Sequence, residues 1–215
     1  GLHLHDLRHT FGYRLRQAGV DKQTRSELLG HTTSDMTEHY SMADLDMLYR
    51  EANKITTPVH ADAVVTLVVI HNISLPPDDY SGDWVERFFV NRLDPSAHPY
   101  FATIAWLEVS AHFFVRRSGR VIQFVGCDHR AWHAGKSSWA GQENCNDYSV
   151  GIELQGSDSE PYTAEQYESL WRLIDALRTR YPIDAIAGHC HVAPGRKTDP
   201  GPSFDWAALR ARYAM

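Results

Sequence analysis

The chain has 215 residues, 43% of them hydrophobic and 22% charged, which is close to ordinary globular usage and allows one core of standard size. Its 27 acidic and 21 basic residues give a formal net charge of −6, which argues against a DNA-binding surface along a whole duplex. No apolar run reaches the ~18 residues of a membrane helix, and three cysteines make a poor disulfide framework, so neither a membrane protein nor a disulfide-rich secreted protein is expected.

Residues 1–54 are predicted to form short helices. Apolar or aromatic side chains recur three or four residues apart along the first of them, at Leu4, Leu7, Phe11 and Leu15. Two more short helices are expected over residues 21–30 and 42–55. The first ten residues lack the basic region followed by an apolar run that is typical of a signal peptide, so the expected location is the cytoplasm.

The pattern changes to that of strands after a linker expected at residues 55–63. Residues 64–70 are rich in β-branched side chains and are typical of a buried strand. Further strands are expected at residues 111–117, 120–125 and 149–154. Gly119 lies between the first two of these and favours a hairpin.

A long helix is predicted in the last third of the chain. Thr163 and Gln166 form the pattern of a capping box, in which side chains and backbone satisfy each other at the start of a helix. Apolar and aromatic side chains then recur at helical spacing as far as Tyr181, and Pro182 ends the helix. Residues 64–215 are therefore expected to form one domain that combines strands with helices.

Candidate metal ligands lie next to the first strand and in a late loop rich in glycine and proline. His71 directly follows the expected strand, and His189 and Asp199 lie in the loop. Two imidazoles and a carboxylate from separate elements, with one position left open, are a ligand set of catalytic zinc, which lowers the pKa of a bound water to ~7. Spacing alone leaves Cys190 and His191 as alternatives to Asp199 for the third ligand.

Two further side chains have the chemistry that such a site needs. Glu153 is suited to act as a general base or proton shuttle. Lys197 can stabilise the oxyanion of a tetrahedral intermediate. The chain has 13 histidines, and a lone histidine is usually a hydrogen-bonded structural group. His112 and His133 are ambiguous in this respect, since they can line a cleft without touching a metal.

Four segments of the chain, residues 68–77, 93–125, 130–156 and 188–206, closely resemble one known family. It is the AmpD-type amidases, the 1,6-anhydro-N-acetylmuramoyl-L-alanine amidases of cell-wall recycling. The resemblance implies an α/β (α+β) fold with a mixed β-sheet flanked by helices, to which the first segment adds a short all-helical appendage. It also implies zinc-dependent hydrolysis, in the cytoplasm, of the amide bond between (1,6-anhydro-)N-acetylmuramic acid and L-alanine in peptidoglycan fragments.

The resemblance also implies a role for each candidate residue. His71, His189 and Asp199 match the ligands of Zn²⁺, and other relatives have a cysteine in place of Asp199. Glu153 and Lys197 match the catalytic pair. In the implied mechanism an activated water attacks the lactyl carbonyl, the metal and Lys197 stabilise the oxyanion, and Glu153 transfers the proton of the water to the alanine nitrogen.

A substrate cleft is implied as well. Asn72, Tyr100 and Trp132 match positions that line it, and the expected partner is an anhydro-muropeptide or another peptidoglycan fragment, with no membrane partner. Asn144 departs from the family, which often has an arginine there in a position suited to the carboxylates of the stem peptide. The alternative function is the same chemistry on intact peptidoglycan, as in an endolysin or autolysin.

The first segment has a resemblance of its own. Residues 2–54 are similar to the C-terminal end of a tyrosine recombinase of the phage-integrase family: His5 and Arg8 match its H-x-x-R box, His31 its second histidine and Tyr40 its nucleophile. The positive charge that phosphoryl transfer requires comes largely from upstream residues of that family, which this sequence does not contain. The segment is therefore interpreted as a structural remnant that binds no nucleic acid but can self-associate. A DNA-binding protein derived from a recombinase is the less favoured alternative.

Overall fold

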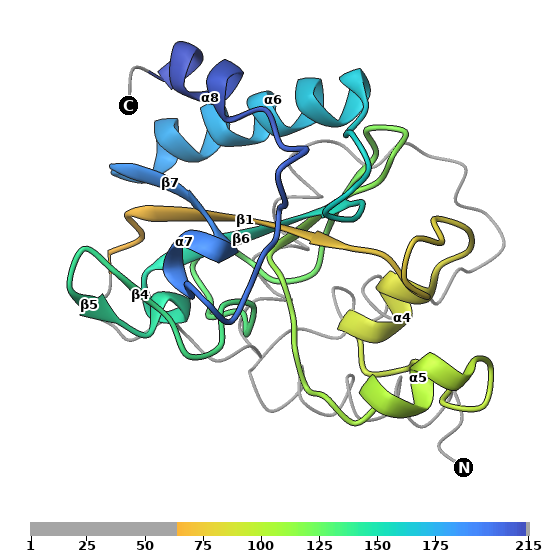
Figure 1. Ribbon diagram of the computed structural model, residues 1–215. Coiled ribbons are helices and arrows are strands. Elements are labelled where there is room, and N and C mark those ends of the chain that lie inside the picture. The colour runs from red at the N-terminus through yellow and green to blue at the C-terminus, as the bar shows by residue number, and fades with distance from the viewer. Residues whose placement is uncertain (1–63, 214–215) are drawn as a thin grey trace, which may run out of the picture. The chain divides into compact units, whose positions relative to one another are not determined.

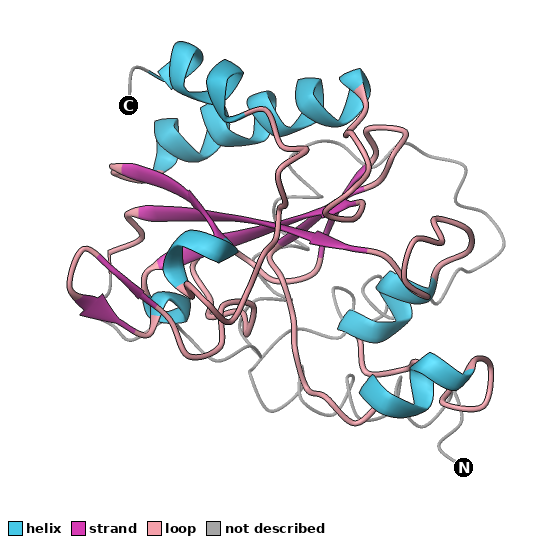
Figure 2. Cartoon of the chain, viewed as in Figure 1, coloured by secondary structure: helices cyan, strands magenta, loops and turns pink. Residues whose placement is uncertain are grey.

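The computed structural model describes residues 64–213. The helices expected within residues 1–54, the linker expected at residues 55–63 and the recombinase-like residues, Tyr40 among them, lie outside the described residues. Figure 1 shows a central sheet with helices on both of its sides, and Figure 2 shows the same chain coloured by secondary structure.

Five strands form the central sheet, in the order β3-β2-β6-β1-β7. Their bounds are β1 Leu67–Ile73, β2 Phe113–Val115, β3 Val121–Gln123, β6 Ser149–Gln155 and β7 Ala185–Gly188. Strand β1 runs parallel to both β6 and β7, β2 runs parallel to β6, and β3 is antiparallel to β2. The mixed sheet implied by the family resemblance is therefore confirmed.

The strands expected from the sequence are present, with shifted ends. Strand β1 starts later than the strand expected at residues 64–70 and continues through His71, because its parallel pairing with β6 extends as far as Ile73 and Gln155. His71 therefore lies within the strand and not directly after it. Strands β2 and β3 form the expected hairpin, and Gly119 adopts the positive φ of 79° that its turn requires.

Several shorter elements were not expected from the sequence. The helices within residues 64–213 are α4 Trp84–Phe89, α5 Pro99–Ile104, α6 Ala164–Arg180, α7 His189–Val192 and α8 Trp206–Tyr213, with a 3₁₀ helix η1 at Cys145–Asp147. A separate two-stranded sheet pairs β4 Ser138–Trp139 with β5 Gln142–Glu143. Of these elements only α6 was predicted. None of the helices in the described part of the chain combines the length and hydrophobicity needed to cross a bilayer.

Helix α6 packs on one face of the sheet, on the same side as α8 (Figure 1), and begins with the predicted capping box. The Thr163 hydroxyl oxygen accepts the backbone N–H of Gln166 at 3.1 Å, and the Gln166 side-chain oxygen accepts the backbone N–H of Thr163 at 3.1 Å. The buried Gln166 amide nitrogen also donates to the backbone oxygens of Val115 on β2 and Gln155 on β6. One side chain thus starts the helix and ties it to two strands.

The two faces of the sheet differ because successive side chains of a strand point to opposite sides. The core beneath α6 takes apolar residues of both central strands, Val68, Ile70, Val150, Ile152 and Leu154. The residues that alternate with them include His71 on β1 and Glu153 on β6, which are register partners on the opposite face. His71 and Glu153 therefore lie on the side of the sheet away from α6.

Candidate metal and catalytic site

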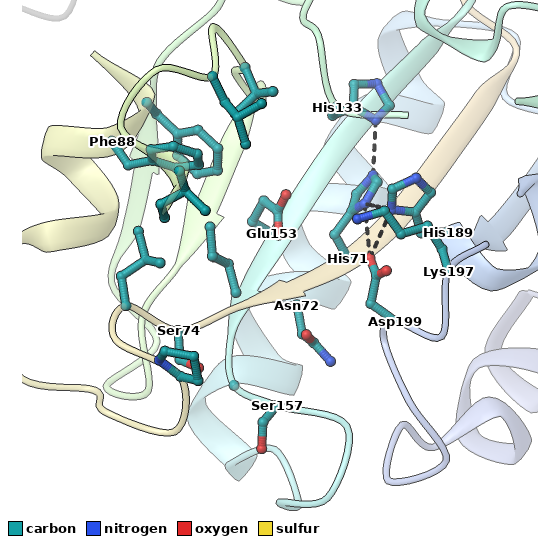
Figure 3. Close-up of a pocket in the computed structure, with 18 of the residues that line it drawn as sticks. His71, Asn72, Ser74, Phe88, His133, Glu153, Ser157, His189, Lys197 and Asp199 are labelled. Atoms are coloured by element: carbon teal, nitrogen blue, oxygen red, sulfur yellow. Dashed lines mark hydrogen bonds and ion pairs between the residues drawn. The ribbon is translucent and has the colours of Figure 1, made fainter. Parts of the chain in front are cut away.

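A cavity of about 600 Å³ lies at the carboxyl end of β1. Its polar side is lined by the five residues predicted for the metal and for catalysis: His71, Glu153, His189, Lys197 and Asp199 (Figure 3). Its apolar side is lined by Leu75, Phe88, Phe89, Ile104, Leu107 and Val109. The structure therefore brings together side chains that lie far apart in the sequence, next to an apolar wall.

Three of these side chains point toward one another (Figure 3). The Nδ1 atoms of His71 and His189 lie 2.9 Å apart, and the Oδ2 atom of Asp199 lies 3.1 Å from the first and 3.0 Å from the second. Both histidines are buried, at 1% and 4% exposure, and the carboxylate is 13% exposed. These three side chains form a group that can hold a metal ion.

The parallel sheet explains why the two histidines meet. Ile70 on β1 is the register partner of Gly188 on β7, and His71 and His189 directly follow these two residues in the sequence. Neighbouring parallel strands end at the same edge of a sheet, so both imidazoles are delivered to one point. The loop that carries Asp199 is held beside His189, since the carbonyl oxygen of Asp199 accepts the backbone N–H of Cys190 at 2.9 Å.

The chemistry of this set fits a zinc ion. The Nε2 atom of His189 lies 3.1 Å from the carbonyl oxygen of Ala134, which can only accept, so Nε2 donates and Nδ1 is the ring nitrogen that faces Asp199. Lone pairs this close repel one another unless a cation lies between them. Ligand atoms of tetrahedral zinc lie about 3.3–3.6 Å apart, so shifts of a few tenths of an ångström would complete the geometry.

The protonation states suit the same role. Burial lowers the pKa of His71 to about 4, so this imidazole is neutral at pH 7, as a metal ligand must be. Burial raises the pKa of the Asp199 carboxyl, but its contacts with His189 and His71 outweigh burial and hold the pKa below its usual range. At neutral pH the set therefore presents one carboxylate and an uncharged His71.

Glu153 stands apart from the ligand set as a buried carboxyl beside the same cavity. It is 8% exposed, and its Oε2 atom has no hydrogen-bond partner among residues 64–213. Burial raises its pKa well above the ordinary value, the charge of Asp199 raises it further, and Lys197 opposes both effects. A buried carboxyl group whose pKa is raised in this way is suited to general acid–base work.

Lys197 is exposed and lines the cavity close to the ligand loop. Its backbone N–H donates to the carbonyl oxygen of Ala193 at 3.1 Å, which holds the turn between α7 and Asp199. An ammonium group in this place can offset negative charge that develops on a substrate bound in the cavity.

The residues predicted to bind substrate are only partly brought together. Asn72, Tyr100 and Trp132 all line the cavity, and the Asn72 amide nitrogen donates to the Asp158 carboxylate at 2.8 Å. Asn144 is exposed, caps η1 with a φ of 57°, and is not found among the described residues that line the cavity.

The geometry distinguishes between the three candidates for the third metal ligand. The ligand group of described side chains contains Asp199 and neither Cys190 nor His191, and the ring of His191 accepts the backbone N–H of Gly188 at 3.0 Å. His133 lines the cavity and contacts the Nε2 atom of His71 at 2.9 Å, whereas His112 is buried behind it.

Among the polar residues of the cavity that were not singled out from the sequence are Asp158 and Arg196. Asp158 lies in a segment rich in turn residues, where nothing in the local pattern marks it. Arg196 lines the cavity and donates to the backbone oxygens of Ala134 and Lys136, each at 2.7 Å. Its place directly before Lys197 was a signal that could have found it.

Comparison with known proteins gives this arrangement a context. The family model described as N-acetylmuramoyl-L-alanine amidase matches residues 61–202. The chain is 53% identical over 167 residues to the 1,6-anhydro-N-acetylmuramyl-L-alanine amidase AmpD of Citrobacter freundii, a match that covers 75% of this chain and 89% of that relative. A second family model, that of the phage integrase family, matches residues 1–46.

Solved structures agree with the sequence relatives. A crystal structure of a selenomethionine derivative of AmpD is 54% identical, with a TM-score of 0.70, and the match covers 72% of this chain and 88% of that one. The amidase AmiD of Escherichia coli, solved with the substrate anhydro-N-acetylmuramic acid-L-Ala-D-γ-Glu-L-Lys, is 28% identical, with a TM-score of 0.53 and coverage of 71% and 59%.

Proposed function

The chain belongs to the N-acetylmuramoyl-L-alanine amidase family and is an amidase of that kind, and on this premise we propose that its substrate is a soluble anhydro-muropeptide. The bond cleaved would be the amide between 1,6-anhydro-N-acetylmuramic acid and L-alanine. The observation that carries the proposal is the convergence of three ligand atoms beside the buried carboxyl of Glu153, whose Oε2 atom has no hydrogen-bond partner among residues 64–213, in one cavity of a chain similar to AmpD.

We propose that His71, His189 and Asp199 hold Zn²⁺. The close lone pairs of the three side chains and the neutral state of His71 support this assignment. When bound, zinc supplies Lewis acidity at the scissile amide. The three protein ligands leave one coordination position free, as catalytic sites do.

Glu153 would handle the proton of the reaction. Its carboxyl is buried beside the cavity, its Oε2 atom has no hydrogen-bond partner in the described part of the chain, and its pKa is raised, so it can accept a proton from the attacking water. The same carboxyl would then give the proton to the departing nitrogen of L-alanine. Lys197 would stabilise the negative charge that develops on the lactyl oxygen.

Asn72, Tyr100 and Trp132 would contact the substrate from the walls of the cavity. AmiD, solved with an anhydro-muramyl tripeptide, supports a substrate of this class. A cytoplasmic location is part of the same proposal and rests on the similarity to AmpD. Whether Asn144 alters recognition of the stem peptide stays a prediction.

We further propose that the amidase domain comprises residues 64–215, joined by residues 55–63 to a helical segment at residues 1–54. All five residues assigned to metal binding and catalysis lie between positions 71 and 199. The first segment would therefore be a recombinase-like remnant without a nucleic-acid partner, able to self-associate through its apolar residues.

Product analysis by mass spectrometry tests the proposed substrate. The full chain with zinc is incubated separately with anhydro-muropeptide and with purified sacculi, and His71→Ala serves as the inactive control. Release of free stem peptide from the anhydro-muropeptide, with little from sacculi, is expected. Faster release from sacculi would favour the alternative of an enzyme that acts on intact peptidoglycan.

A further inference from the structure

A buried chain of hydrogen bonds leads away from His71 on the side opposite the ligand set. The Nε2 atom of His71 lies 2.9 Å from the Nδ1 atom of His133 (Figure 3). The Nε2 atom of His133 lies 3.2 Å from the hydroxyl oxygen of Ser149, and that hydroxyl donates to the carbonyl oxygen of Cys145 at 2.6 Å. All four residues are buried.

The last bond in this chain decides where the protons of the others lie. The Ser149 hydroxyl has a single proton and donates it to the Cys145 carbonyl, so it can only accept from His133. His133 therefore carries its proton on Nε2, and its Nδ1 atom accepts. The Nε2 atom of His71 must then be the donor, which leaves the Nδ1 lone pair of His71 facing His189 and Asp199.

The same short segment also orients the second histidine ligand. The carbonyl oxygen of Ala134, the residue after His133, accepts the proton on Nε2 of His189 at 3.1 Å. The backbone of this segment is held by Asn146, whose side-chain oxygen accepts the N–H of His133 at 3.1 Å and the N–H of Ala134 at 2.8 Å. His133 and Ala134 thus determine which ring nitrogen of His71 and of His189 has its lone pair available to a metal ion.

The fold reserves space for the His133 ring at Gly151 on strand β6. A Cβ atom at Gly151 would lie 2.4 Å from Cγ and 2.6 Å from Nδ1 of His133. The imidazole therefore packs directly on the backbone of the strand, a contact that a side chain at this position would prevent.

We propose that His133 is a positioning residue for the metal ligands, with Ser149 and Asn146 holding it in place. It acts through His71 and, by its backbone neighbour Ala134, through His189. This inference rests on the proposed zinc site and deepens it. Groups that orient metal-bound histidines typically change metal affinity by about 10–100-fold when they are lost.

The test measures zinc affinity of the full chain by competition with a chromophoric chelator, independently of turnover. His133→Leu should weaken zinc binding by about 10–100-fold, and Ser149→Ala should weaken it less. His133→Asn should recover much of the loss, because its amide oxygen can take the place of Nδ1 and accept the proton of His71. Equal affinity of His133→Leu and the unsubstituted chain would overturn the proposal.

His112→Leu is the matched control. His112 is also buried, and its ring centre lies 5.7 Å from that of His133, but its nitrogens contact the backbone of Gly151 and His129 and not a ligand. Its loss should lower the melting temperature without a comparable loss of zinc affinity. If both leucine variants weaken zinc binding equally, the effect is general loosening of the core and the positioning role is wrong.

A measurement on the unsubstituted chain covers the case in which the variants fail to fold. Long-range ¹H–¹⁵N correlation spectra of the zinc-loaded protein identify which ring nitrogen carries the proton. His71 and His133 should both be protonated at Nε2, and a proton on Nδ1 of either ring would refute the chain of bonds. If His71→Ala also leaves zinc binding unchanged, the proposed metal site itself is wrong, which is a separate outcome.

Discussion

Replacing Gly151 by alanine should displace the ring of His133, the residue proposed to position the metal ligands. The added Cβ would lie 2.4, 2.6 and 2.7 Å from three atoms of the His133 ring, where ordinary contacts are 3.4–4 Å. Because Gly151 lies in a buried central strand, the ring must move. Overpacking costs about 1–3 kcal/mol, and the two hydrogen bonds lost by the ring add about 0.5–1.5 kcal/mol each.

The expected loss of stability is therefore about 2–6 kcal/mol. For a chain of this length each kcal/mol lowers the melting temperature by about 2–4 °C, so a decrease of about 4–24 °C is expected. Thermal unfolding followed by circular dichroism in metal-free protein measures it, and zinc affinity should fall in the same variant. Gly141→Ala is a control with open space around the Cβ but a φ of +84°. It reports the conformational cost alone, about 1–2 kcal/mol. The predicted clash with His133 is absent if Gly151→Ala unfolds no earlier than Gly141→Ala and binds zinc as tightly as the unsubstituted chain.

Four further predictions follow from the site. Chelation should abolish amidase activity and zinc should restore it, whereas full activity in metal-free protein would contradict the zinc assignment. Glu153→Gln should keep zinc and lose ~10²–10⁴-fold in kcat, and Lys197→Ala should lose ~10²–10³-fold; unchanged turnover in either variant would show a wrong assignment. Burial lowers the pKa of His71 and of His112 to about 4, so the unfolded state binds more protons between pH 6.5 and pH 4. Metal-free protein should lose stability as the pH falls through that window, by up to ~1.4 kcal/mol per pH unit for each histidine, and a flat profile in calorimetry would contradict this. Deleting residues 1–55 should leave turnover within a few-fold while changing solubility or oligomeric state, and an inactive but folded truncation would contradict the remnant interpretation.

The sequence predicted elements whose signal is local and strong. The β-branched run of β1 and the capping box of α6 depend on neighbouring residues, and both were found close to where they were expected. Strand β7 is only four residues long, and α4 and α5 are six residues each, so their patterns are too short to be distinguished from loops.

The candidate site was predictable to the extent that its residues stand beside recognisable elements or motifs. His71 and His189 could be paired because a strand and a motif mark them. Their contact depends on the register between β1 and β7, which no local pattern contains. The part played by His133 was equally hidden, because it depends on a glycine 18 positions later in the sequence and on a serine in the same strand.

The position of β1 in the sheet also affects how the chain can fold during its synthesis. This strand precedes all the others described, yet its two neighbours are β6 and β7, and 118 residues separate His71 from His189. At about 5–20 residues per second, a ribosome needs about 6–24 s to make the intervening chain. Until β6 has been made, β1 has no partner on either edge, and its edge toward β7 stays unpaired until residues 185–188 follow. During this time its apolar side chains are available to chaperones or to other nascent chains. The central strand therefore makes this fold a late-folding one, in which contacts of high sequence separation must form together near the end of translation.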